Sequence, residues 1–307
     1  RQGQVMSDHA QGVDVWHQLS AEALEREYSP SSCIGGNYLP FVMAYQTRSA
    51  EARTQCSEQG ATWQRIQYGS TPEQRLELCL PPPGKAPSAK PGLLIFIHGG
   101  YWQELSADDS LFAATGCVQH GLAFAALNYT LAPDASVPDI VAECRLAVAW
   151  LQAHANELGF DPARIVVAGS SAGAHLAAMV ALPRDTGPVP APIHAAVLVS
   201  GIYALEPLIG TSVNVALGLN AATARQVSPA LQPLRGFPQA LVCWGANETA
   251  EFKRQSRGFA ADLAAQGTPC EVFEVEGRNH FDVIMDLADT HAVLGRKSLA
   301  LLQDQSC

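Results

Sequence analysis

The sequence has little positive charge: 19 lysine and arginine residues stand against 29 aspartate and glutamate residues, for a formal net charge of -10. This balance argues against nucleic acid and anionic membrane surfaces as partners. Long apolar runs are also missing, since none reaches the roughly 18 residues that a membrane span needs. No signal-peptide pattern opens the chain. We therefore expect a cytoplasmic protein, in which the residues before Met6 are candidates for a processing remnant.

Paired cysteines and clustered metal ligands are missing as well. The eight cysteines form no C-x-x-C pair, and several lie within apolar runs. This pattern favours buried free thiols in a reducing compartment. His98, His175 and His280 show no ligand spacing, and neither a Walker loop nor a G-x-G-x-x-G motif occurs where a nucleotide-binding fold needs it. We expect no metal and no other cofactor.

Apolar residues are abundant. Hydrophobic residues make up 48% of the 307 residues and charged residues 16%, so the chain can bury a sizeable core. From residue 62 onward, short strand patterns alternate with helical ones, which predicts a mainly parallel sheet with helices on both faces. We expect one domain over residues 1–307, with a helical extension at 1–60 and a cap-like insertion at 202–237. Strands are predicted at 62–68, 75–80, 93–97, 122–129, 194–200, 239–245 and 270–276 and directly before residue 169, and helices at 21–28, 41–58, 108–120, 138–158, 250–266 and within 282–302.

One stretch points to chemistry. The segment 169–173, Gly-Ser-Ser-Ala-Gly, follows a β-branched apolar run and precedes an alanine-rich helical run. It fits the G-x-S-x-G motif with Ser171 at its centre, where flanking glycines permit a tight strand-to-helix turn. The turn places Ser171 at a helix N-terminus and points the Ala172 N–H to where an oxyanion would form. The alternative is a Gly/Ser-rich turn without chemistry.

A serine hydroxyl needs a base and an orienting carboxylate before it is an effective nucleophile. This motif predicts the chain order serine, acid, histidine. His280 fits the base, because it lies in a flexible loop after the last predicted strand. The other downstream histidines suit packing or capping (His175), the start of a strand (His194) and the surface of a helix (His291).

The loop after the strand at 239–245 contains two carboxylates, Glu248 and Glu251. We favour Glu248 as the acid because it lies nearer the strand end. Glu251 suits a first-turn charge on the next helix, where it would stabilise the helix dipole. A third candidate, Asp282, is two residues from His280 and suits the N-cap of the closing helix.

The turn at 98–102, His-Gly-Gly-Tyr-Trp, follows another buried strand and exposes backbone N–H groups. Gly100 and Tyr101 would donate them to the oxyanion beside Ala172, and His98 would shape the turn. Residues 28–45 and the insertion at 202–237 are expected to shape the pocket. Candidate substrate-binding side chains are those of Trp102, Ile202 and Tyr203.

Together these residues resemble the α/β-hydrolase superfamily over residues 62–303. Three local features are similar to its kynurenine formamidase (arylformamidase) branch and bacterial esterase relatives. They are His-Gly-Gly-Tyr-Trp-Gln at 98–103, Glu-Arg-Glu-Tyr-Ser-Pro-Ser at 25–31, and the segment 248–256 followed by His-Phe-Asp-Val-Ile at 280–284. The resemblance implies a triad of Ser171, Glu248 and His280, with glutamate where that family usually has aspartate.

The resemblance further implies a cofactor-free serine hydrolase that cleaves a small-molecule acyl compound through an acyl-enzyme. The first expectation is hydrolysis of an aryl formamide of the N-formylkynurenine type. A carboxylesterase acting on small aromatic or short-chain esters or carbamates is the alternative. A catalytically inert binding protein with a hydrolase fold is the alternative from another class. A homodimer is compatible with all three.

Overall fold

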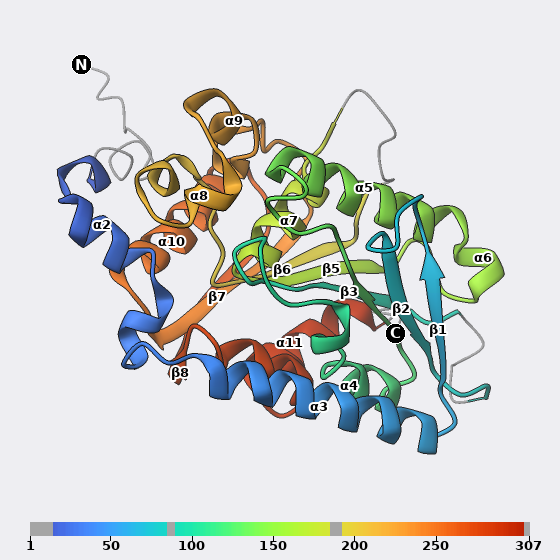
Figure 1. Ribbon diagram of the computed structural model, residues 1–307. Coiled ribbons are helices and arrows are strands. Elements are labelled where there is room, and N and C mark those ends of the chain that lie inside the picture. The colour runs from blue at the N-terminus through green and yellow to red at the C-terminus, as the bar shows by residue number, and fades with distance from the viewer. Residues whose placement is uncertain (1–14, 85–89, 185–191, 304–307) are drawn as a thin grey trace.

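The computed structural model describes residues 15–84, 90–184 and 192–303, so the residues before Met6 lie outside the described part of the chain. An eight-stranded sheet forms the centre of the molecule (Figure 1). The order across the sheet is β1-β2-β4-β3-β5-β6-β7-β8, with β2 antiparallel to both of its neighbours and every other pair parallel. The strands are β1 (Thr62–Gln67), β2 (Arg75–Leu80), β3 (Leu93–Ile97), β4 (Ala123–Leu127), β5 (Ile165–Ser170), β6 (Ala195–Val199), β7 (Gln239–Asn247) and β8 (Cys270–Asn279).

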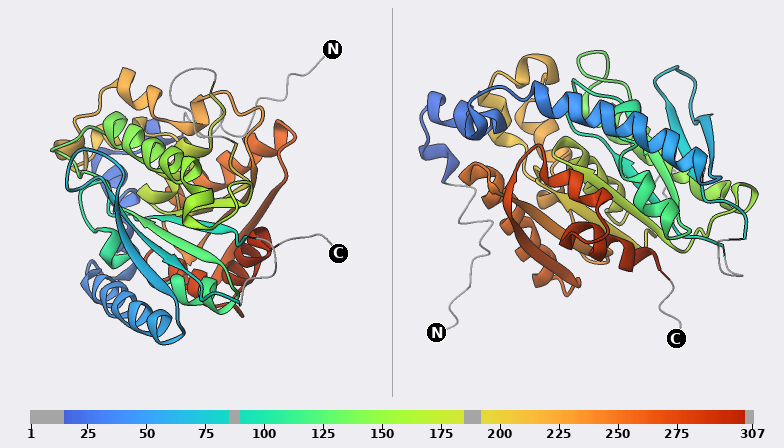
Figure 2. Two further views of the ribbon diagram at one scale, coloured as in Figure 1. Left: turned by 90° about the vertical axis from the view of Figure 1, so that its right-hand side faces the viewer. Right: turned by 90° about the horizontal axis from the view of Figure 1, so that it is seen from below.

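Helices cover both faces of this sheet (Figure 1). One face carries α2 (Ala21–Glu27), α5 (Val137–Ala153), α6 (Ala155–Leu158), α7 (Ala172–Ala181), α8 (Asn214–Leu217), α9 (Ala221–Gln226) and α10 (Ala250–Ala265). The other carries α3 (Leu39–Glu58), α4 (Ala114–Gln119) and α11 (Val293–Leu302), and Figure 2 shows α3 running along this face beside α4. Short 3₁₀ helices η1–η6 lie at Trp16–Gln18, Pro30–Ile34, Ala107–Asp109, Glu206–Gly210, Pro229–Leu231 and Val283–Ala288.

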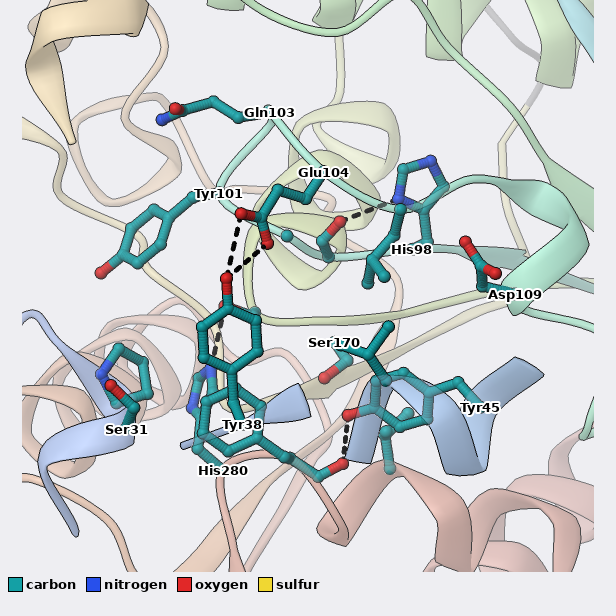
Figure 3. A pocket seen from close by; sticks show the side chains of 18 of the residues that line it. Ser31, Tyr38, Tyr45, His98, Tyr101, Gln103, Glu104, Asp109, Ser170 and His280 are labelled. Carbon is teal, nitrogen blue, oxygen red and sulfur yellow. Dashed lines mark hydrogen bonds between the residues drawn. The ribbon is translucent and has the colours of Figure 1, made fainter. Parts of the chain in front are cut away.

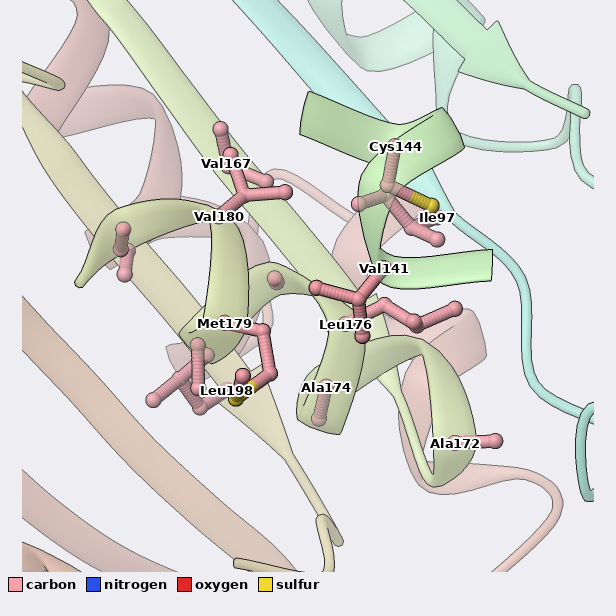
Figure 4. Close-up of a cluster of buried hydrophobic side chains, with 14 of the residues drawn as sticks. Ile97, Val141, Cys144, Val167, Ala172, Ala174, Leu176, Met179, Val180 and Leu198 are labelled. Carbon is pink, nitrogen blue, oxygen red and sulfur yellow. The ribbon is translucent and has the colours of Figure 1, made fainter. Parts of the chain in front are cut away.

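Two hydrophobic cores fill the space between the sheet and its helices. Successive strand residues point to opposite faces, so Leu93, Ile95 and Ile97 enter one core while Leu94 and Phe96 enter the other. Each fully buried apolar side chain of this kind stabilises the fold by roughly 1.5–3 kcal/mol. Figure 4 shows the first core around α7, where the labelled side chains include Ile97, Val141, Cys144, Val167, Leu176, Met179 and Leu198.

The predicted α/β fold is confirmed, but two predicted helices are divided. The helix at 108–120 is instead η3 followed by α4, because the N–H of Leu111 bonds the Ser49 hydroxyl (3.0 Å) rather than a helical carbonyl. The helix at 138–158 is divided at His154, whose ring nitrogen Nδ1 bonds the Trp150 carbonyl (2.8 Å) and caps α5 before α6 begins.

The last two strands extend past their predicted ends, and this extension matters for the site. Asn247 of β7 pairs with Asn279 of β8 after a register shift at Gly245. A Cβ at Gly245 would lie 2.5 Å from the carbonyl oxygen of Arg278, so only glycine permits this approach. The next residues along the two strands are Glu248 and His280, which the pairing therefore brings side by side.

The sheet also has a topological switch point. The chain leaves β3 toward β4 on one side, whereas it leaves β5 toward β6 on the other. Ligands of open α/β sheets bind at such a point, outside the carboxyl ends of the strands. The turn at 98–102 and Ser171 both lie there.

Two further expectations concern membrane spans and cysteines. Over the described ranges, no helix combines the length and hydropathy needed to cross a membrane. All seven cysteines in those ranges are free thiols, and five of them, Cys56, Cys79, Cys117, Cys144 and Cys243, are buried.

Candidate active site

Ser171 occupies a strained turn between β5 and α7, with φ 58° and ψ -120°. Two glycines allow this corner to close. A Cβ at Gly169 would lie 2.1 Å from the carbonyl oxygen of Gly173, and a Cβ at Gly173 would lie 1.9 Å from that of Ile97. The motif therefore needs glycine at both ends for steric reasons, and strain of this kind is concentrated at functional sites.

A chain of hydrogen bonds runs from Ser171 through His280 to Glu248. The Ser171 Oγ lies 3.0 Å from His280 Nε2, and His280 Nδ1 lies 2.6 Å from Glu248 Oε1. Because a carboxylate only accepts, Nδ1 carries the proton and Nε2 is free to accept from the serine hydroxyl. All three residues are buried, at 8%, 5% and 8% exposure for the serine, the histidine and the glutamate. The arrangement has the geometry of a nucleophile, a base and an orienting acid.

The second oxygen of Glu248 is held by a residue that sequence reasoning missed. Ser200 Oγ donates to Glu248 Oε2 at 2.6 Å, and the Gly245 N–H donates to the same oxygen at 2.6 Å. Ser200 follows β6, is fully buried and has a positive φ of 52°. No sequence motif marks it, because only the adjacency of β6 and β7 brings it to Glu248.

The other two candidate acids are engaged elsewhere. Glu251 lies in the first turn of α10, as predicted. It is buried there, accepting from the Tyr28 hydroxyl (2.7 Å) and pairing with Arg254 (2.7 Å). Asp282 stands at the N-cap position of η6 without capping it. Its carboxylate accepts instead from the Asn279 N–H at 2.7 Å, and burial raises its pKa.

The turn at 98–102 packs directly on the serine corner. A Cβ at Gly99 would lie 2.7 Å from the Ser170 carbonyl oxygen, so the two loops touch through backbone. Gly100 and Tyr101 have positive φ angles of 97° and 52°. Within the described ranges, the N–H groups of Gly100, Tyr101 and Ala172 have no hydrogen-bond acceptor. These are the donors expected for an oxyanion.

His98 and His175 are structural histidines. His98 Nδ1 lies 2.8 Å from the Gly99 carbonyl, and its ring stacks on Tyr129 at 4.2 Å. His175 lies 2.7 Å from the Val227 carbonyl through Nε2 and accepts from Trp102 Nε1 through Nδ1 at 3.2 Å. Both are fully desolvated, and this burial lowers the pKa of each to about 4.

These two depressed pKa values predict acid sensitivity. A histidine whose pKa is about 6.5 unfolded and about 4 folded stabilises the fold above pH 6.5, and this stability is lost as the pH falls toward 4. For each of the two histidines, the unfolding free energy should fall by roughly 2 kcal/mol when the pH is lowered from 7 to 5. Urea unfolding of the wild type and of His175→Gln at both pH values measures this. The variant should lose roughly 2 kcal/mol less than the wild type, and equal losses would contradict the assignment.

A cavity of about 410 Å³ opens over Ser171 and His280 (Figure 3). This volume suits a small organic ligand. Seven aromatic residues line it: Tyr28, Tyr38, Tyr45, Phe96, Tyr101, Phe112 and Phe281. The segment 28–45 supplies seven lining residues, namely Tyr28, Ser29, Pro30, Ser31, Tyr38, Val42 and Tyr45. The insertion at 202–237 supplies only Ser212 and Val213, so the N-terminal segment forms more of the wall than the insertion does.

The three predicted substrate-binding side chains do not line this cavity. Trp102 is fully buried because its positive φ of 61° turns the indole into the core, toward His175. Ile202 is also fully buried, and Tyr203 stacks on Phe259 at 4.3 Å. The sequence signal for the wall was instead the cluster of aromatic residues in the segment 28–45.

The N-terminal segment is tied to the active-site loops. The Tyr101 hydroxyl donates to the Tyr28 carbonyl, and the Thr249 hydroxyl donates to the Glu27 carbonyl at 2.7 Å. Tyr38 stacks on Phe281, the residue after His280, at 5.6 Å. Segments far apart in the chain thus enclose one site.

The fold and this site define a hydrolase of the α/β-hydrolase superfamily. The BD-FAE family model matches residues 76–194. The chain is 30% identical to kynurenine formamidase of Danio rerio over 94% of this chain and 98% of the relative, and 30% identical to that of Salmo salar over 89% and 94%. A Silicibacter structure provisionally described as a thioesterase superposes with a TM-score of 0.76 at 27% identity, covering 91% of this chain and 98% of that one. The chain belongs to the kynurenine formamidase family. Membership of this family makes it an enzyme and sets aside the inert binding protein.

Proposed function

We propose that this enzyme hydrolyses aryl formamides, with Ser171 as nucleophile, His280 as general base and Glu248 as the orienting acid. The observation that carries the proposal is the unbroken hydrogen-bonded path from Glu248 to the Ser171 hydroxyl, at a switch point of the sheet. The aromatic lining of the cavity suits an aryl leaving group. Kynurenine formamidases match nearly the full length of the chain, which favours a formamide substrate of the N-formylkynurenine type.

The geometry supports the following steps. Ser171 Oγ attacks the formyl carbon while His280 Nε2 takes the hydroxyl proton. The carbonyl oxygen becomes an oxyanion beside the N–H groups of Gly100, Tyr101 and Ala172, each worth roughly 3 kcal/mol in such sites. The C–N bond then breaks, and His280 returns the proton to the departing aryl amine. Water, activated by the same imidazole, releases formate from the formyl-enzyme.

A carboxylesterase is the second candidate. Esterases are among the relatives and the similar structures, including esterase LipC of Mycobacterium tuberculosis at 27% identity and Est2 of Thermogutta terrifontis at 25% identity with a TM-score of 0.61. The same nucleophile and general base serve for an ester as for an amide. The two candidates differ in the acyl group and in the leaving group, not in the machinery.

Parallel assays of purified protein with N-formylkynurenine and p-nitrophenyl acetate separate them. A formamidase should turn over the formamide with a kcat/KM at least tenfold above that for the activated ester, although the ester is chemically easier to cleave. Turnover of the ester alone would move the assignment to a carboxylesterase. Turnover of neither would contradict both.

Ser200 gives a prediction about the acid. Removing its hydroxyl leaves Glu248 with one fewer charge-assisted hydrogen bond, which is worth about 1.5–3 kcal/mol. We expect Ser200→Ala to lower kcat roughly tenfold with little change in KM, because Ser200 does not line the cavity. Ser200→Gly is the matched variant, since it relaxes the positive φ and also lacks the hydroxyl. Equal losses in both variants support positioning by the hydroxyl, whereas full activity in Ser200→Gly would contradict it.

A further inference from the structure

The cavity over Ser171 is negatively charged. Three carboxylate residues line it: Glu25, Glu104 and Asp109. No lysine or arginine is among the described residues of its wall. Its two histidines do not offset this charge. His98 has its pKa lowered by burial to about 4, and His280 hydrogen-bonds Ser171 and Glu248.

The partners of these carboxylates are neutral donors. Glu104 accepts from the Tyr38 hydroxyl at 3.0 and 3.1 Å. Glu25 accepts from the N–H and the hydroxyl of Ser212, the former at 2.8 Å. Asp109 accepts from Ser106, through the N–H at 2.9 Å and the hydroxyl at 3.2 Å. Within the described part of the chain no ion pair neutralises any of the three, so their charge acts on whatever occupies the cavity.

The carboxylates lie on two sides of the reacting groups. In Figure 3, Glu104 and Tyr38 meet above His280, while Asp109 lies on the other side of the cavity, toward Tyr45. Glu25 comes from α2 and belongs to the wall built by the N-terminal segment. The electrostatic potential is therefore negative on both sides of the reacting groups. A cleft lined by charge of one sign concentrates ligands of the opposite sign. The net charge of -10 on the whole chain adds to this potential.

We infer that the enzyme selects aryl substrates whose side chain is cationic or neutral and discriminates against a free carboxylate. This inference rests on the proposed function for the acyl group, but the charge preference concerns the leaving group. An ammonium group on the aryl side chain finds carboxylates to pair with, whereas a carboxylate finds like charges and no cation. For a zwitterionic amino-acid side chain, the ammonium group supplies the recognition and the carboxylate stays in solvent at the mouth of the cavity.

The test uses three formanilides that differ only at the end of one ortho side chain, which carries an ammonium, a hydroxyl or a carboxylate group. At low ionic strength we expect kcat/KM to fall in that order, with about tenfold or more between the first and the last. The ratio should shrink in 0.5 M salt, because exposed charges are then screened. A ratio near one, or a preference for the carboxylate, would overturn the inference.

Two variants identify the source of the selectivity. Glu25→Gln and Glu104→Gln keep an acceptor for Ser212 and Tyr38 but remove the charge, and each should reduce the ammonium-to-carboxylate ratio about threefold. Glu51→Gln is the matched control, because Glu51 is exposed on α3 and does not line the cavity. If both cavity variants kept the wild-type ratio, the inference would be wrong.

Phenyl acetates carrying the same three side chains separate this inference from the proposed function. Turnover of the acetates alone, in the same charge order, would reject the formamidase and support the charge preference. If neither series is hydrolysed, calorimetric titration of the protein with the three matching anilines gives the same comparison. Tighter binding of the ammonium compound supports the inference, and equal or reversed affinities refute it.

Discussion

Replacing Ser171 by alanine is expected to lower kcat by about four orders of magnitude or more. The hydroxyl oxygen is the atom that His280 Nε2 reaches at 3.0 Å, and the remaining oxyanion donors stabilise a transition state that then has no attacking group. Alanine adopts the same backbone with similar strain, so the fold and the affinity for the leaving group should be kept. Hydrolysis of N-formylkynurenine and p-nitrophenyl acetate by the variant measures the loss.

Ser170→Ala is the matched control for that experiment. Ser170 precedes Ser171 in the same motif and also lines the cavity, but its hydroxyl has no partner among the described residues. Its removal should change kcat less than about threefold, because the buried Ser170 hydroxyl makes no hydrogen bond within the described ranges that the substitution would break. A serine-directed phosphonate should label the wild type and Ser170→Ala but not Ser171→Ala. Turnover that survives in Ser171→Ala would reject the mechanism.

Local patterns in the sequence predict the fold and the order of the reacting groups. The β-branched run before Gly169 predicts β5, because such side chains suit a strand buried on both faces. The glycines of the motif predict the corner that carries Ser171, and the chain order of its partners points to the loops after β7 and β8. The position of His280 in the loop after the last strand predicts it as the base, although the pairing of β7 with β8 cannot be read from the sequence.

The cavity wall could not be predicted in the same way, because it depends on contacts between distant segments. Trp102 is an aromatic residue in a turn that follows a buried strand, which favours a place in the pocket wall. A positive φ instead turns its side chain into the core. Ser200 lies next to Glu248 only because β6 and β7 are neighbours. Glu251 has the sequence position of a charge in the first turn of a helix. It is buried in the structure, and its carboxylate accepts a hydrogen bond from the hydroxyl of Tyr28, 223 positions away. Tertiary packing overrides the local pattern at each of these residues.

The second large effect concerns the corner itself. Glycine to alanine inside a helix ordinarily stabilises a protein by about 1 kcal/mol, and Gly173 lies in the first turn of α7 without a positive φ. Here the added Cβ would stand 1.9 Å from the Ile97 carbonyl oxygen and 2.7 Å from that of His98, both backbone atoms.

Because backbone must move to relieve this overlap, we expect Gly173→Ala to lose more than about 3 kcal/mol of unfolding free energy, with loss of hydrolysis as β3 and the serine corner separate. Urea unfolding measures the change. Gly159→Ala isolates conformational strain from steric overlap, since Gly159 has a φ of 94° and no atom within 4 Å of its added Cβ. It should cost only about 1 kcal/mol. Equal losses in the two variants would mean that the contact between Gly173 and β3 does not limit the packing of the corner.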